Sequence, residues 1–241
     1  MNVSVISNPP RDAAEAGRRR YAALMETLER RVTVRSFDPA QAVSDETCRL
    51  ILEAARLAPS GANAQPWQFI VVADEALRRG VGAALEASGA EHQGARSAPG
   101  CIVVATDFRL SWAFPGLLDG TELDQRYHAT AERIILQSVA CATMAAHLAA
   151  TALGYATWWI TALGQEDLQA ELRRRLEVPE DLTITDVMLF GVPARPVSRR
   201  WKKQAADITS WNRFDMANFR SLDQIDAWMR DVRSRAGRWL R

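Results

Sequence analysis

The sequence predicts a fold that mixes helices with a buried sheet, in one domain followed by a C-terminal extension. Short apolar runs rich in β-branched residues, such as Cys101–Thr106 and Leu182–Phe190, are typical of buried strands. Longer segments between them carry apolar residues at helical spacing. With 241 residues, 48% hydrophobic and 24% charged, the chain can bury a substantial core, and we find no internal repeat or low-complexity linker.

The N-terminal part predicts two helices. Residues 1–20 are polar and arginine-rich, so we expect a loose arm or a short leading helix. Helical spacing of apolar residues then predicts a helix over Tyr21–Arg31. Ser44 is a plausible N-cap for the next helix, which includes Thr47–Leu57.

Two strands and a helix follow. The apolar runs Phe69–Ala73 and Cys101–Thr106 predict strands, and Asp74–Ala87 between them predicts a helix. Residues 107–126 combine Trp, Phe, Pro and Gly without clean periodicity, which indicates a lid-like excursion.

The segment Tyr127–Leu153 predicts one long central helix that is apolar on most faces. The stretch Ile134–Ile160 is long enough to cross a bilayer, but Gln137 and His147 would be costly in hydrocarbon. We therefore expect the core of a large soluble fold or a dimer interface, and no membrane association.

The C-terminal part predicts a strand, a helix, a strand and a basic tail. Ala156–Thr161 and Leu182–Phe190 read as strands around a polar helix over Gln165–Leu176. The last strand ends at Gly191-Val192-Pro193. Beyond it, basic residues and tryptophans are interleaved with aspartates.

Several function classes are disfavoured. The net charge of +1 argues against a dedicated nucleic-acid binder. The three cysteines are odd in number and far apart, and the three histidines lack ligand spacing, so we expect no disulfide framework and no metal site. The run Gly80–Leu85 lacks the third glycine of a dinucleotide fingerprint and lies inside a predicted helix. With no signal-peptide pattern visible, a reducing, cytoplasmic setting fits best.

The loop Ala58–Trp67 is the most informative segment. Its prolines and glycine prevent regular structure between a predicted helix and a predicted strand. Its Ser, Asn and Gln side chains could serve a flat, polar-edged ligand, but the same residues also make ordinary turns.

Two basic clusters could bind an anion. Arg31, Thr33 and Arg35 alternate along an extended chain, so we expect them to point to one side. Two guanidinium groups and a hydroxyl on one side suit phosphate oxygens. Arg200 and Lys202 repeat the alternation.

Taken together, the two basic clusters and the Pro-Ser-Gly-x-Asn-x-Gln-Pro-Trp loop between them resemble the FMN-dependent nitroreductase family. The resemblance covers about Leu24 to Ile208, with the motifs in the family's order. It implies an α+β fold with a central, mostly antiparallel sheet, assembled as a homodimer of the domain-swapped type with two FMN sites at the interface. We accordingly expect an N-terminal arm (1–20), an FMN-binding domain (21–208) and an extension (209–241) that packs on the partner subunit.

The resemblance also implies the cofactor contacts. Arg31 would hold the phosphate and Arg35 would lie near the N1/O2 edge of the ring, where positive charge stabilises the reduced flavin. Two positions depart from the family's pattern: Val32 stands where the family often has a second arginine, and Gln204 replaces a frequent proline. The expected FMN-binding residues are Arg31, Val32, Thr33, Arg35, Pro59, Ser60, Gly61, Asn63, Gln65, Ala162, Arg200 and Lys202.

Thr161 falls, by its spacing, at the position that presents a hydrogen-bond donor to flavin N5. A backbone N–H there suits hydride transfer, whereas a threonine hydroxyl resembles the deiodinase branch, where it supports one-electron steps. The residue could equally just end a strand.

The implied enzyme passes hydride from NADH or NADPH through FMN to a planar acceptor such as a nitroaromatic or a quinone. The flavin supplies the chemistry and the protein supplies binding and electrostatics. Trp112, Phe114 and Tyr127 are the candidate acceptor-stacking residues, although such aromatics can also be structural. The alternatives are the same fold with other chemistry, such as reductive dehalogenation or a specialised oxidase, and a flavin-binding protein without turnover.

Overall fold

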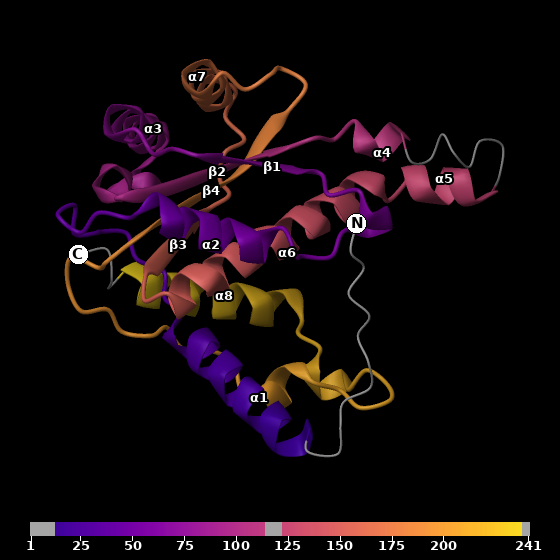
Figure 1. Cartoon of the computed structure of the whole chain (residues 1–241). Coiled ribbons are helices and arrows are strands. Elements are labelled where there is room, and N and C mark those ends of the chain that lie inside the picture. Colours follow the sequence, from indigo (N-terminus) through magenta and orange to yellow (C-terminus); the bar gives the residue numbers. More distant parts are fainter. Residues whose placement is uncertain (1–12, 114–121, 238–241) are drawn as a thin grey trace. The chain divides into compact units, whose positions relative to one another are not determined.

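The computed structural model describes residues 13–113 and 122–237, and it divides into two units after Ser198. The first unit is built on a sheet of four strands in the order β1-β2-β4-β3 (Figure 1). The second unit is described by itself below. The strands are β1 (Trp67–Val71), β2 (Gly100–Thr106), β3 (Ala156–Ile160) and β4 (Thr183–Gly191).

All three strand pairings in this sheet are antiparallel, which confirms the expected α+β class. The register between β2 and β4 shifts between Val104 and Ala105, so that Thr185 is an extra residue on β4. One parallel bridge, between Thr33 and Thr157, joins the segment around Thr33 to the edge strand β3. β1 begins two residues earlier than predicted, because Trp67 pairs with Thr106 and is buried.

Helices cover both faces of the sheet (Figure 1). On one face, α3 (Glu75–Ser88) and α7 (Glu166–Leu176) pack on a core that includes Val103 and Leu189. On the other face, α2 (Asp45–Ala55) and α6 (Ala131–Ala152) pack on Ile102 and Phe190. Consecutive strand residues point to opposite faces, so each strand feeds both cores.

Helix α6 is the one described helix long and apolar enough to cross a membrane. It packs against α2 and the sheet through Ala146 and Ala150, which explains its apolar composition by burial in a core. The prediction of one helix over Tyr127–Leu153 was wrong at its start. The chain turns at residues 129–130, which separates α5 (Glu122–His128) from α6.

Side-chain caps begin two of the helices, and the one at Ser44 was predicted from the sequence. Ser44 Oγ accepts a hydrogen bond from Thr47 N at 3.1 Å and so begins α2. Asp74 Oδ1 accepts from Leu77 N and begins α3. Of the two readings of residues 1–20, the helical one holds from Ala13 on, since α1 spans Ala13–Arg30. The remaining short helices of this unit are η1 (Gly61–Asn63), η2 (Ala90–His92), η3 (Ala95–Ser97) and α4 (Leu110–Ala113).

The second unit, residues 199–241, begins earlier than the extension expected at 209. Near the end of the first unit, Ala194 N donates a backbone hydrogen bond to Ser36 O. Inside this unit, the ring of Trp228 lies between Lys203 Nζ at 4.7 Å and the Arg220 guanidinium at 5.4 Å. Its elements are η5 (Ala205–Ile208), η6 (Met216–Asn218) and α8 (Leu222–Gly237).

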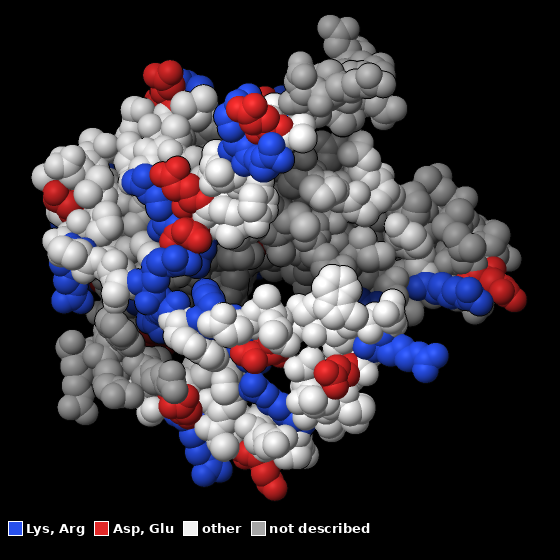
Figure 2. Space-filling view, turned by 90° about the horizontal axis from the view of Figure 1, so that it is seen from below, with Lys and Arg blue, Asp and Glu red and all other residues white. Residues whose placement is uncertain are grey.

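Charges of both signs lie next to one another over the face drawn in Figure 2. The described residues also form exposed ion pairs within one helix, such as Arg79–Glu75 and Arg174–Glu171. Exposed pairs of this kind contribute little to stability, so the stability of the fold must come mainly from the two apolar layers.

Candidate active site

The segment that carries the first basic cluster is fixed between two strands. Val34 N donates to Thr157 O at 3.1 Å, beside β3. Asp38 N donates to Val192 O at 2.8 Å, just past the end of β4. The arginines therefore stand where the edge of β3 and the end of β4 meet.

The expectation that Arg31, Thr33 and Arg35 share one side fails for Arg35. Its guanidinium carbon lies 5.3 Å from the centre of the Trp158 ring, which belongs to the core under α3 and α7. The chain bends at Arg35, and this bend ends the alternation of an extended strand. Val32 packs against the same core, so its side chain does not line the arginine face.

The pKa of His147, a buried histidine of α6, is affected by burial and by the positive charge of Arg31. Burial, and secondarily the positive charge of Arg31, lower the pKa of His147 to about 3. Both ring nitrogens of His147 lack a hydrogen-bond partner among the described residues, as do the hydroxyls of Thr143 and Thr157. Because buried polar atoms are normally paired, this group offers unused hydrogen-bonding capacity beside Arg31 and the Thr33–Thr157 bridge.

The loop that follows α2 holds a strained backbone. Ala62, Asn63 and Gln65 have φ of 52°, 54° and 48°, a region that residues other than glycine seldom adopt. Gln65 N donates to Ser60 Oγ at 3.0 Å, and Gly61 N donates to Ser138 Oγ at 3.1 Å. Strained conformations of this kind cost about 1–3 kcal/mol each and cluster at functional sites, which favours the ligand loop over the ordinary turn.

Gly61 is required by a close approach to α6. A Cβ there would lie 2.2 Å from Ile134 Cγ2. We expect Gly61→Ala to destabilise the protein by about 1–3 kcal/mol, because the added methyl overpacks this contact. Urea unfolding of Gly61→Ala, Ile134→Ala and the double variant measures it. The double variant should regain most of the Gly61→Ala loss, and strict additivity would contradict the contact.

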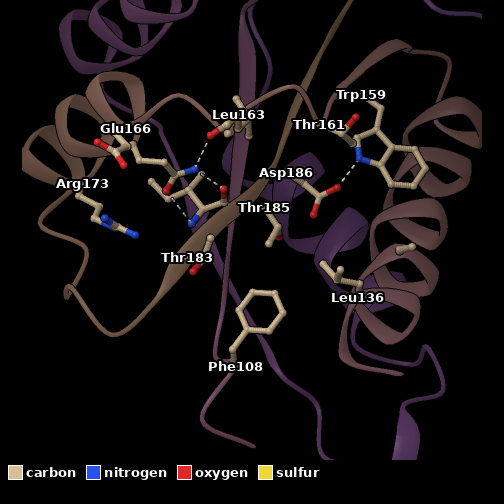
Figure 3. A pocket seen from close by; sticks show the side chains of 14 residues that line it. Phe108, Leu136, Trp159, Thr161, Leu163, Glu166, Arg173, Thr183, Thr185 and Asp186 are labelled. Atoms are coloured by element: carbon tan, nitrogen blue, oxygen red, sulfur yellow. Dashed lines mark hydrogen bonds between the residues drawn. The ribbon is translucent and has the colours of Figure 1, made fainter. Parts of the chain in front are cut away.

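A cavity of about 640 Å³ opens at the end of the sheet, between β3, β4, α6 and α7 (Figure 3). Thr161, the residue predicted to face flavin N5, lines it. Asp186 of β4 also lines it and accepts a hydrogen bond at Oδ1 from Trp159 Nε1 at 2.5 Å. The bulge residue Thr185 lies beside Asp186, bonded to Thr106 through the two hydroxyls at 2.7 Å. Bulges of this kind re-aim side chains and are frequent next to active sites.

Within one chain, α6 separates the strained loop from the cavity. Ser138, which holds the loop, and His147, whose ring lies 5.3 Å from the Trp159 ring, are nine residues apart. At about 3.6 residues per turn, nine residues put the two on opposite sides of a helix. Ala140, which lines the cavity, lies about two whole turns before His147 and shares its side.

The structure thus brings together only part of the predicted set. Arg31, Thr33 and Thr161 lie along the β3 edge, with Ala162 next in the chain, whereas the loop residues Pro59, Ser60, Gly61, Asn63 and Gln65 lie across α6. Arg200 and Lys202 are exposed residues of the second unit, and their part in the site stays a prediction.

The structure describes one of the three candidate acceptor-stacking residues in full. The side chain of Trp112 and all of Phe114 lie outside the described residues, and Tyr127 is half-buried near the end of α5. Sequence reasoning missed Asp186, although its signal was present: a lone acid inside an apolar strand. The sequence reasoning correctly assigned residues 80–85 to an ordinary helix, α3. Gly82 serves close packing there, because a Cβ on it would lie 2.7 Å from Arg96 Cα.

Comparison with known proteins shows which family this chain belongs to. The model of the nitroreductase family matches residues 28–192. A protein of Archaeoglobus fulgidus named "Putative NADH dehydrogenase/NAD(P)H nitroreductase" is 31% identical over 163 residues, which cover 68% of this chain and 81% of that protein.

Solved structures show the same fold. The crystal structure titled "Putative NADH dehydrogenase/NAD(P)H nitroreductase" from Bacteroides thetaiotaomicron superposes with a TM-score of 0.61 at 26% identity, covering 80% of this chain and 98% of that one. An NADPH:FMN oxidoreductase from Vibrio harveyi, complexed with NAD+, superposes with a TM-score of 0.64 at 19% identity, covering 88% and 85%.

Proposed function

Because the chain belongs to the nitroreductase family, we propose that it is an FMN-dependent oxidoreductase that uses NADH or NADPH to reduce a planar acceptor such as a nitroaromatic or a quinone. The observation that carries this proposal is the family match over residues 28–192, which spans both the strained loop and Thr161. The three cysteines are free thiols, two of them buried, which supports the expected reducing, cytoplasmic setting.

The residues present fit FMN. Phosphate needs cationic and hydroxyl donors, which Arg31 and Thr33 supply at the β3 edge and to which Arg200 and Lys202 would add. Thr157, the backbone bridge partner of Thr33, has a buried hydroxyl without a hydrogen-bond partner among the described residues, so hydrogen-bonding capacity remains close to this segment. When bound, FMN supplies hydride acceptance and donation at N5.

The chain's own residues bind and orient. Arg31 and Thr33 would hold the phosphate, a part also proposed for Arg200 and Lys202, and Arg35 would supply positive charge to a reduced ring only on leaving its contact with Trp158. Thr161 presents a hydrogen-bond donor at the mouth of the cavity in which the acceptor is reduced. Trp159 and Phe108 give this cavity apolar walls against which a flat ring can pack.

We further propose that the working form is a homodimer in which each site takes residues from both chains. The support is the position of α6, which stands between the strained loop and the cavity of one chain. One side of α6 is only partly covered: Cys141 is exposed, and the apolar residues Met144, Ala145 and Leu148 are of intermediate burial. Such a face suits contact with a second copy, whose loop could then reach the cavity side.

The proposal is tested first by the absorption spectrum of the purified protein. We expect bound FMN that bleaches under anaerobic NADH or NADPH and recovers on addition of 1,4-benzoquinone or nitrobenzene. A protein that takes up no FMN would overturn the flavin reading. Bound FMN that neither nucleotide bleaches would leave a binding protein without turnover.

Mixing of two defective chains tests the shared site. Arg31→Ala and Asn63→Ala each remove a side chain from a different chain's part of the shared site, so neither pure protein should bind FMN well. After refolding of an equal mixture, about one site in four should bind FMN, because half of the random dimers are mixed and each of these has one intact site. The FMN content of the repurified mixture measures this. If the mixture binds no more than its two components, each site lies within one chain.

A second reaction is favoured by one observation, the presence of the Thr161 side chain in the cavity lining. A hydroxyl at this position would support one-electron chemistry, as in reductive dehalogenation of a haloaromatic. Thr161→Val keeps the shape and removes the hydroxyl. Loss of haloaromatic reduction, with quinone reduction kept, would establish this branch; no haloaromatic turnover by the native protein would exclude it.

A further inference from the structure

The carboxyl group of Asp186 occupies an unusual position for an acid. It lies on β4, is 95% buried with a relative exposure of 5%, and faces the cavity that Thr161 also lines (Figure 3). Among the described residues no lysine or arginine forms an ion pair with it, and its Oδ1 accepts the Trp159 Nε1 hydrogen bond. An ionised carboxylate in such surroundings is costly, so the neutral acid is favoured.

The electrostatic surroundings agree with a neutral acid. Burial raises the pKa of Asp186, while hydrogen bonding from neighbouring side chains offsets part of the rise. The other titratable or charged groups around the cavity are Glu166 and Arg173 of α7, and His147 of α6, whose ring contacts Trp159. Oδ1 accepts the indole N–H, and the Thr185 hydroxyl is a further hydrogen-bonding neighbour of the carboxyl group. In the step proposed below, Oδ2 carries the proton.

We propose that Asp186 donates a proton to the acceptor reduced in this cavity, so that the preferred acceptors are those, like quinones, whose reduction ends in a new O–H bond. This inference rests on the proposed function. It names a catalytic residue and a substrate class for the cavity, and it follows from the position of one buried acid.

The step balances for 1,4-benzoquinone. The quinone receives a hydride from the reduced cofactor, which brings two electrons and one proton. The Oδ2–H bond of Asp186 breaks as the second O–H bond of the hydroquinone forms, and the carboxylate takes a proton from water before the next turnover. Trp159 Nε1–H remains bonded to Oδ1 and stabilises the transient carboxylate.

Asp186→Asn tests the role, because asparagine can keep the Trp159 hydrogen bond but cannot give up a proton. We expect the reduced protein to transfer electrons to benzoquinone about 100-fold more slowly, the usual size of a general-acid contribution. Reduction by NAD(P)H and reoxidation by ferricyanide, which takes electrons without a proton, should match the native protein. Asp181→Asn makes the same change at an exposed carboxylate and should have no effect.

An equilibrium measurement keeps the test independent of turnover. Calorimetry measures the binding of benzoate to the oxidised protein. The affinity should fall up to tenfold per pH unit once Asp186 ionises, because the benzoate anion then faces a carboxylate anion. Asp186→Asn should remove this dependence, and Glu166→Gln shows how much of it comes from Glu166. Benzoate binding that is absent or independent of pH in the native protein would overturn the role of Asp186.

The failures are distinguishable. If NAD(P)H does not bleach the native protein, the proposed function fails. If bleaching is normal and Asp186→Asn passes electrons to benzoquinone as fast as the native protein, the Asp186 inference alone fails.

Discussion

Replacement of Arg31 with alanine is expected to weaken FMN binding about 10- to 150-fold, which corresponds to about 1.5–3 kcal/mol for a hydrogen bond to a charged group. Arg31 is half-buried beside the Thr33–Thr157 bridge, where solvent competes less with a phosphate than at an open surface. Quenching of flavin fluorescence during titration of the apoprotein gives the dissociation constant. The loss should be smaller at high salt, because screening weakens the native contact as well.

The neighbouring arginine provides a matched control. Arg30 is exposed at the end of α1 and bonds to Glu26 at 3.3 Å. Arg30→Ala removes the same charge one residue away and should change the FMN dissociation constant less than twofold, since exposed pairs contribute little. Equal effects of the two changes would mean that only the general field of the surface matters, and the assignment of Arg31 to the phosphate would be wrong.

The helices and strands could be read from the sequence because local signals and burial agree in them. Ser44 begins a helix as its capping chemistry predicts, and the β-branched runs became strands within two residues of their expected bounds. The break between α5 and α6 was missed, because apolar spacing continues across residues 129–130 while the backbone turns there. The bulge at Thr185 depends on pairing with a distant strand and leaves no local signal.

The candidate site was harder to predict than the fold, since proximity in space is not proximity in sequence. Motif order linked Arg31 to the loop around Asn63, yet α6 stands between them in one chain. Alternation predicted one shared side for Arg31, Thr33 and Arg35, but a bend turned Arg35 onto Trp158, and Val32, expected at the cofactor, packs against the core. Asp186 stands out in the sequence as a lone acid in an apolar strand, but its burial and its indole partner become visible only in the structure.

Acidification should destabilise the folded protein through His147. Its pKa is about 3 when folded, against the ordinary value of 6.5, so the unfolded chain binds a proton between these pH values that the folded chain does not. Stability is therefore fully present above pH 6.5 and is lost as the pH falls toward 3, at about 1 kcal/mol per pH unit below pH 6. The free energy of unfolding in urea, measured at pH 7, 6, 5 and 4, gives the slope.

Two replacements of different polarity isolate this contribution. His147→Met and His147→Gln both remove the titrating ring, and both should make the slope between pH 6 and pH 4 shallower by about 1 kcal/mol per pH unit. Asp186, whose raised pKa acts in the opposite direction, is common to all three proteins and cancels in the comparison. The two variants should differ in their free energy of unfolding at pH 7. Glutamine, like the native histidine with its two unpaired ring nitrogens, buries polar atoms in this pocket, whereas methionine buries no polar group that needs a partner. An unchanged slope in both variants would mean that the folded protein admits a proton to this pocket, and the cluster beside Arg31 would then be open to water.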